Sequence, residues 1–187
     1  IGSFVARGLI VNKLVDKVVC LDHFGRYVDS TTNKFKDFRP QRVMGIEDNV
    51  IIERGDARYQ SIVSKLVQKY KPEFIFHLAA LPLAKLSNLN TEEAIEGTAL
   101  TTTYFLETIG NMENYRPKRF IYVSSSMTYG DFKSEIALES DNQSPKEIYG
   151  TMKLAGEVIT RGLCDFYNID YSIVRPSAVY GPTDMNR

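Results

Sequence analysis

The sequence predicts an α/β protein built on a doubly wound parallel sheet. Five short apolar runs alternate along the chain with longer segments of helical character, which is typical of parallel strands joined by crossover helices. The runs are nearly continuous in apolar residues, as expected for strands covered by helices on both faces. We expect strands at Val18–Asp22, Val50–Glu53, Phe74–Leu78, Arg119–Ser124 and Tyr171–Arg175.

Helices are expected between these strands, and their apolar residues recur at helical spacing. The predicted helices span Ser3–Leu14, Tyr59–Tyr70, Thr91–Met112 and Lys146–Tyr167. The second ends at Lys71-Pro72, because a proline cannot continue a helix. The polar segment Asp29–Arg42 has no periodicity, so we interpret it as a surface excursion after the second strand.

Both ends of the chain predict an incomplete fold. The sequence opens at Ile1-Gly2, directly at the start of a predicted helix, and stops soon after Gly181-Pro182. We therefore expect one domain over residues 1–187 that lacks the strand before that helix and most of a C-terminal lobe.

Composition excludes several classes of protein. Lysine plus arginine and aspartate plus glutamate both number 23, so no basic field would attract nucleic acid. Cys20 and Cys164 fall in a predicted strand and helix, which favours buried thiols and a reducing cytoplasm over a disulfide. The most apolar stretch, around Phe74–Ala84, is too short for a bilayer, and no secretory pattern is visible. His23 and His77 have no ligand spacing, so no metal site is predicted.

Tyr149 and Lys153 place a phenol and an ammonium four residues apart, and three serine hydroxyls lie upstream at Ser124, Ser125 and Ser126. On a helix the pair shares one face, so the Lys153 charge would favour the Tyr149 phenolate. A phenol needs its pKa lowered by roughly three units, about 4 kcal/mol, to act as a base near neutral pH. The spacing alone also fits an ordinary exposed pair on an amphipathic helix.

The motifs around this pair favour the catalytic interpretation. The predicted strand Val18–Asp22 ends in a carboxylate twenty residues after Gly2, an interval typical of dinucleotide-binding units. The alternative is that Asp22 is only a helix-capping or turn aspartate at the end of a strand. The other motifs, in chain order, are Ile1-Gly2-Ser3, Gly55-Asp56-Ala57-Arg58, His77-Leu78-Ala79-Ala80, Ser124-Ser125-Ser126-Met127-Thr128-Tyr129-Gly130, and Arg175-Pro176 with Val179-Tyr180-Gly181-Pro182.

Together these motifs resemble the nucleotide-sugar epimerase/dehydratase family of extended short-chain dehydrogenases/reductases, which has a Rossmann-like fold. The resemblance covers nearly the whole chain, although the first two glycines of the family's pyrophosphate-binding turn are absent. It implies a cofactor, and Asp22 favours NAD over NADP because its charge would repel a 2′-phosphate. The implied cofactor-binding residues are Gly2, Asp22, Asp56, Ala57, Leu78, Ala79, Ala80, Ser124, Tyr149, Lys153 and Pro176.

The resemblance also implies the catalytic roles. Tyr149 would move the proton, Ser125 would hydrogen-bond the substrate oxygen, and Lys153 would hold the nicotinamide ribose. The implied substrate-binding residues are Ser125, Ser126, Met127 and Tyr149. We interpret His77 as structural or cofactor-lining, not as catalytic. The long helices Thr91–Met112 and Lys146–Tyr167 correspond to helices that often pair across a two-fold axis, which predicts a homodimer.

Departures from the family pattern affect which of the family's reactions is expected. Ala94 and Ala178 stand where family members carry asparagines, which weakens inference about the proton relay and the nucleotide. Ser126 and Met127 stand where dehydratases place an acid and a base, which disfavours elimination. The favoured hypothesis is an NAD-dependent nucleotide-sugar epimerase, with little activity expected from residues 1–187 alone. The alternatives are a keto-sugar reductase, a dehydratase and a non-catalytic dinucleotide-binding module.

Overall fold

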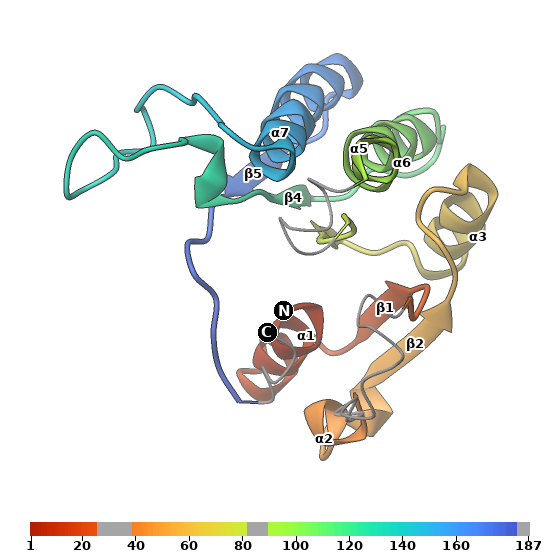
Figure 1. Cartoon of the computed structure of the whole chain (residues 1–187). Coiled ribbons are helices and arrows are strands. Elements are labelled where there is room, and N and C mark those ends of the chain that lie inside the picture. The colour runs from red at the N-terminus through yellow and green to blue at the C-terminus, as the bar shows by residue number, and fades with distance from the viewer. Residues whose placement is uncertain (26–38, 82–89, 183–187) are drawn as a thin grey trace. The chain divides into compact units, whose positions relative to one another are not determined.

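The computed structural model describes residues 1–25, 39–81 and 90–182. Residues 29–38 of the predicted surface excursion lie outside this part. The chain forms two compact units, one made of Ile1–Asp56 with Ala178–Arg187 and the other of Ala57–Ser177. Each unit is an α/β structure with its own parallel sheet (Figure 1).

The first unit contains a two-stranded parallel sheet. Its elements are α1 (Gly2–Val11), β1 (Val18–Asp22), α2 (Arg39–Val43), the 3₁₀ turn η1 (Glu47–Asn49) and β2 (Val50–Arg54). Strands β1 and β2 pair in register from Val18↔Val50 to Asp22↔Arg54. Both predicted strands are confirmed. Helix α2 was not predicted, because it falls in a segment without apolar periodicity. Its end is tied to α1, since the Arg7 guanidinium donates to the carbonyl of Met44, the residue that follows α2, at 2.8 Å.

The second unit contains a three-stranded parallel sheet in the order β3-β4-β5. Its elements are α3 (Gln60–Tyr70), β3 (Phe74–His77), α5 (Thr91–Ala94), the π turn η2 (Ile95–Leu100), α6 (Thr101–Gly110), β4 (Arg119–Val123), the 3₁₀ turn η3 (Ser126–Thr128), α7 (Ile148–Tyr167) and β5 (Tyr171–Val174). Each of these strands ends one residue before the predicted end. The predicted α/β class with parallel strands is confirmed.

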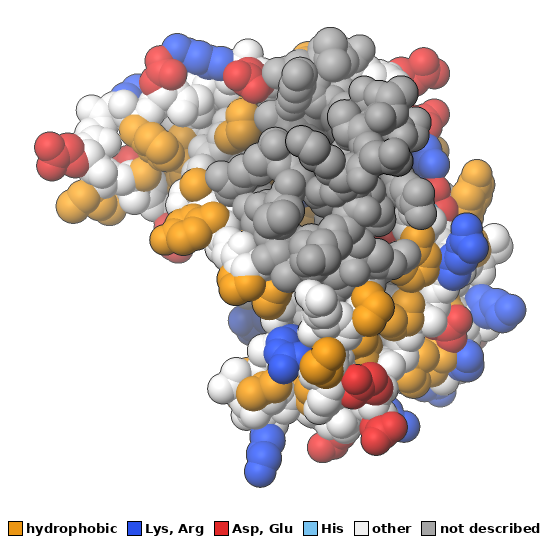
Figure 2. Space-filling model, turned by 60° about the horizontal axis from the view of Figure 1, so that its bottom comes forward, with side chains coloured by type: hydrophobic (Ala, Val, Ile, Leu, Met, Phe, Trp, Pro, Cys, Tyr) orange, Lys and Arg blue, Asp and Glu red, His pale blue; other side chains and the backbone are white. Residues whose placement is uncertain are grey.

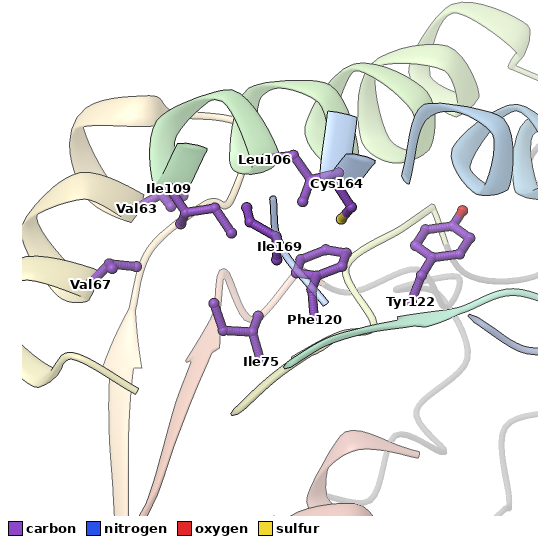
Figure 3. Close-up of a cluster of buried hydrophobic side chains, with 9 residues drawn as sticks. All are labelled: Val63, Val67, Ile75, Leu106, Ile109, Phe120, Tyr122, Cys164 and Ile169. Atoms are coloured by element: carbon purple, nitrogen blue, oxygen red, sulfur yellow. The ribbon is translucent and has the colours of Figure 1, made fainter. Parts of the chain in front are cut away.

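The core of the second unit lies between its helices and one face of its sheet. Figure 3 shows Val63 of α3 and Leu106 and Ile109 of α6 above Phe120 of β4, with Val67 of α3 to one side. The full cluster comprises Val63, Val67, Ile75, Leu106, Ile109, Phe120, Tyr122, Cys164 and Ile169. Strand β4 is buried continuously over its centre, as predicted. Strand β3 instead alternates, with Ile75 buried and Phe76 exposed.

The predicted helix Thr91–Met112 is interrupted by the π turn η2. Gly97 in this turn packs so closely on the preceding segment that an added Cβ would lie 3.3 Å from the Leu81 backbone nitrogen. The Thr101 hydroxyl donates to the Glu96 carbonyl, five residues earlier, at 2.7 Å. The wider turn therefore coincides with a close approach of two segments, and such turns are often found at functional sites.

Helix α7 packs against the sheet at Gly156. A Cβ at this position would lie 2.0 Å from the Tyr122 hydroxyl oxygen, so a glycine is needed for the phenol to fit. The Tyr122 hydroxyl donates to the Lys153 carbonyl at 3.3 Å. Tyr122 therefore joins the middle of β4 to the first half of α7, in the same unit as the predicted catalytic residues.

The surface shows no segregation of charge on the face drawn in Figure 2, where basic and acidic side chains of the described residues lie intermingled. In the part of the chain that the structure describes, no helix is long and apolar enough to cross a bilayer. Cys164 is buried and Cys20 is partly buried, and both thiols are free.

Candidate active site

The candidate site is assembled where β4 ends and α7 begins. After β4 the chain stays extended through Ser125, which caps the 3₁₀ turn η3 by accepting a hydrogen bond from the Met127 N–H at 3.2 Å. Tyr149 lies in the first turn of α7, close enough for the Ser125 side chain to act on the pKa of its phenol. The structure therefore brings together two of the three predicted catalytic residues.

Lys153 lies one turn beyond Tyr149 on the same face of α7. Its side chain is 4% exposed, and Nζ donates to the Val123 carbonyl at 2.8 Å. Nζ lies 5.8 Å from the centroid of the Tyr149 ring and 5.6 Å from that of Tyr122. Burial lowers the pKa of Lys153 to about 8, so the group is still largely cationic at neutral pH.

Burial raises the pKa of Tyr149 above its ordinary value in the protein alone, while hydrogen bonding by Ser125 acts in the lowering direction. The spacing of Tyr149 and Lys153 correctly predicted a shared helix face. Spacing gives no information on the cost of burying a phenolate, because that cost depends on packing.

The Ser124 hydroxyl has a different hydrogen-bond partner from the Ser125 hydroxyl. Its hydroxyl donates to the Glu157 carboxylate Oε1 at 2.6 Å, and the residue is 3% exposed. The Ser124 hydroxyl hydrogen is therefore used by Glu157, and the cofactor-lining role of this residue stays a prediction.

The predicted substrate-binding residues Ser126 and Met127 form η3, beside the start of α7. A Cβ on Gly150 would lie 2.5 Å from the Met127 carbonyl oxygen, which shows how closely η3 and α7 approach. The Ser126 N–H donates to the Pro176 carbonyl at 3.0 Å. Pro176, after β5, thus lies beside the serine segment, and Ser125, Ser126, Met127, Tyr149 and Pro176 form one local group.

The remaining predicted cofactor residues fall into two sets. Leu78, Ala79 and Ala80 follow β3 in the second unit, with Ala79 exposed. Gly2 starts α1, Asp22 ends β1 and Asp56 follows β2; these belong to the first unit, whereas Ala57 opens the second.

Asp22 combines a turn role with an accessible carboxylate. Its Oδ1 accepts from the Phe24 N–H at 2.7 Å, the alternative that the sequence left open, yet the side chain is 60% exposed. In the first unit, an exposed carboxylate at the end of a parallel strand is the kind of group that accepts hydrogen bonds from ribose hydroxyls. In the second unit, Lys153 is a buried ammonium with three N–H donors, one of which is used by the Val123 carbonyl.

His77 is a core residue. It is 3% exposed, its ring lies within 6.0 Å of the rings of Phe105, Phe120 and Tyr122, and burial lowers its pKa to about 3. Its Nε2 is 3.1 Å from the Thr102 hydroxyl, whose own hydrogen is donated to the Thr98 carbonyl. Nε2 therefore carries the proton of a neutral ring. This supports the structural interpretation of His77.

Sequence reasoning missed Glu157, a fully buried carboxylate that is hydrogen-bonded to Ser124, next to Ser125. Arg175, which was noted only as part of a loop motif, donates to it through Nε and Nη2, each at 2.8 Å. A signal was present, because Glu157 lies four residues after Lys153 and eight after Tyr149, on the same helix face.

Comparison with known proteins identifies the class. The model of the NAD dependent epimerase/dehydratase family matches residues 1–187, and the chain belongs to this family. The predicted family is thereby confirmed, and NAD as the cofactor agrees with it.

Individual relatives include members with different reactions. The chain is 27% identical to a UDP-glucose 4-epimerase of Mycolicibacterium smegmatis over 95% of its own length and 55% of that protein. It is 27% identical to a dTDP-D-glucose 4,6-dehydratase of Dictyostelium discoideum over 73% of its own length and 33% of that protein. The chain thus spans about half or less of these relatives.

A solved structure supports the fold. The UDP-glucuronic acid 4-epimerase of Bacillus cereus, in complex with UDP-glucuronic acid and NAD, superposes with a TM-score of 0.80 at 27% identity. The alignment covers 97% of this chain and 55% of that one. The Rossmann-like architecture predicted from the sequence is confirmed.

Proposed function

We propose that this chain is the NAD-binding and catalytic part of a nucleotide-sugar 4-epimerase. The observation that carries the proposal is the group formed by Ser125, Tyr149 and Lys153. Tyr149 and Lys153 lie one turn apart on α7 with Nζ 5.8 Å from the centroid of the Tyr149 ring, and Ser125 caps the adjoining turn η3. NAD, when bound, would accept a hydride from the sugar carbon and later return it to the opposite face.

The chain's own residues would handle the proton and the oxygen. Tyr149 would take the proton of the sugar hydroxyl as that carbon is oxidised, and would give it back when the keto-sugar is reduced. Ser125 would hydrogen-bond the same oxygen as it changes between alcohol and ketone. Lys153 would hold the nicotinamide ribose and place a positive charge beside the developing phenolate.

The neighbouring turn favours epimerisation over elimination. Loss of water from a keto-sugar needs an acid and a base near the substrate, and the two positions after Ser125 are Ser126 and Met127, neither of which titrates usefully near neutral pH. Dehydratases among the relatives make elimination the second candidate. Product mass separates them, since an epimer has the mass of its substrate and a dehydratase product is one water lighter.

The assay uses the protein expressed from its complete coding sequence, with NAD and a panel of UDP- and dTDP-hexoses. We expect interconversion of one 4-epimer pair without stoichiometric consumption of NAD. A reductase would need added reduced cofactor in each cycle, and a binding module would retain NAD without converting any sugar.

The catalytic assignment is tested with Tyr149→Phe. We expect turnover to fall by about 10² to 10⁴-fold, the usual range for loss of a general base. Tyr59→Phe, at an exposed position before α3, is the matched control and should keep wild-type turnover. Wild-type turnover in Tyr149→Phe would show that the base lies elsewhere.

We also propose a homodimer that pairs helices α6 and α7, which lie side by side in Figure 1. Apolar side chains remain exposed on both helices. Tyr104 of α6 is 37% exposed, and Val158 and Phe166 of α7 are 59% and 75% exposed. Burial of such side chains would favour association.

A further inference from the structure

Glu157 accepts hydrogen bonds from three segments that are distant in sequence. Ser124, just after β4, donates to Oε1 at 2.6 Å, and Arg175, just after β5, donates to both carboxylate oxygens. Gln143, in the segment between η3 and α7, donates to Oε2 at 3.0 Å. These four residues are called the Glu157 cluster below.

The cluster is buried and strongly charged at its centre. Glu157 is fully buried and the Arg175 side chain is 13% exposed. Burial alone would raise the pKa of Glu157, but the hydrogen bonds from Arg175, Ser124 and Gln143 outweigh it and lower that pKa. The carboxylate is therefore ionised throughout the neutral range. Arg175 extends the cluster by donating to the Tyr129 hydroxyl at 2.7 Å and the Glu139 carbonyl at 3.0 Å.

A buried ion pair is poor evidence for stability, because the cost of desolvating both charges can exceed their attraction. Geometric specificity is the better-supported reason for such a pair. Here the geometry concerns Ser125. Its neighbours are held on both sides, since the Ser124 N–H donates to the Val174 carbonyl at 2.8 Å and the Ser126 N–H to the Pro176 carbonyl at 3.0 Å. The Glu157 cluster adds a side-chain restraint on Ser124.

We propose that Glu157 is a positioning residue, which directs the Ser125 hydroxyl toward Tyr149 by holding the adjacent Ser124 and the end of β5 against α7. This inference rests on the proposed function, because Ser125 and Tyr149 are its catalytic pair. A displacement of about 1 Å between reacting groups can reduce a rate by roughly 10²-fold. The cluster therefore acts on the chemical step and not on the binding of cofactor or sugar.

The test compares Ser124→Ala and Glu157→Gln in the protein expressed from its complete coding sequence. We expect kcat to fall by about tenfold or more, with KM for the sugar nucleotide and Kd for NAD within about twofold of wild type. Arg161→Gln is the matched control, because Arg161 contacts Glu157 Oε2 at 3.0 Å from the solvent side, with 40% of its side chain exposed, and joins no strand to α7. Its kcat should not change.

Two results would overturn the proposal: kcat within twofold of wild type in Ser124→Ala, or a rise in KM without a fall in kcat. If Glu157→Gln fails to fold, Ser124→Ala decides alone, since it leaves the Glu157–Arg175 pair in place.

Crystal structures of the wild type and Ser124→Ala give a readout that does not need turnover. A longer distance from Ser125 Oγ to the Tyr149 hydroxyl oxygen in the variant than in the wild type supports the positioning role, and an unchanged distance refutes it. If the wild-type protein converts no sugar nucleotide, the proposed function fails while this structural comparison still judges the role of Glu157.

Discussion

The contact between Gly156 and Tyr122 allows a sharp test of the packing that supports the site. A Cβ at Gly156 would lie 2.0 Å from the Tyr122 hydroxyl oxygen and 2.5 Å from Cζ, well inside van der Waals contact. Tyr122 has little room to move, because it is 1% exposed and stacks on His77 with ring centroids 6.0 Å apart. Gly156→Ala must therefore displace either the phenol or the helix.

Gly162 on the same helix is the matched control, since a Cβ there meets nothing within 4 Å. In both variants alanine gains about 1 kcal/mol of helix propensity over glycine. At Gly162 this gain stands alone, so Gly162→Ala should raise the free energy of unfolding by up to about 1 kcal/mol. At Gly156 overpacking costs typically 1–3 kcal/mol, and the short contact points to the upper part of that range. Gly156→Ala should thus be destabilised by about 1–2 kcal/mol.

The difference between the two variants isolates the packing cost, because the propensity gain cancels. Urea unfolding followed by far-UV circular dichroism measures it, and the chain contains no tryptophan to serve as a fluorescence probe. Tyr122→Phe combined with Gly156→Ala should recover part of the loss, since it removes the atom nearest to the new Cβ. Equal stability of Gly156→Ala and Gly162→Ala would refute the packing argument.

Two further predictions concern His77 and the proposed dimer. Between pH 6.5 and about 3 the unfolded chain binds a proton at His77 that the folded chain does not, so the folded state loses stability as pH falls through this range, by up to roughly 5 kcal/mol. His77→Gln should remove this part of the decrease in the free energy of unfolding, measured as a function of pH below 6.5. The same decrease in the variant as in the wild type would contradict the burial of a neutral ring. Val158→Glu on α7 should shift the protein from dimer to monomer in sedimentation velocity. Val11→Glu on α1, where the valine is 58% exposed against 59% for Val158, should not.

The strands were predictable because their signal is local. Each apolar run of four to six residues became a parallel strand, and the predicted ends differ by one residue at most. The π turn was not predictable, because it depends on how Gly97 meets the Leu81 backbone, a contact between separate segments. Helical periodicity over residues 91–112 gave no sign of it.

The grouping of the candidate residues was predictable from the sequence, but their electrostatics were not. The order of motifs located Ser125, Tyr149 and Lys153, which the structure places near one another, and their catalytic roles stay predictions. The raised pKa of Tyr149 and the role of Ser124 as a donor to Glu157 depend on burial. Neither follows from spacing.

The pairing of Glu157 explains why the Lys153 charge remains available in the site. Lys153 and Glu157 are four residues apart on α7, the spacing at which a lysine and a glutamate commonly pair. In the described part of the chain the ion pairs of Glu157 are instead with Arg175 and Arg161, and Lys153 donates to the Val123 carbonyl. A direct pair would neutralise the ammonium that lies beside the Tyr149 ring. Because Arg175 occupies the carboxylate, the ammonium of Lys153 is not drawn to Glu157 and stays 5.8 Å from the centroid of the Tyr149 ring.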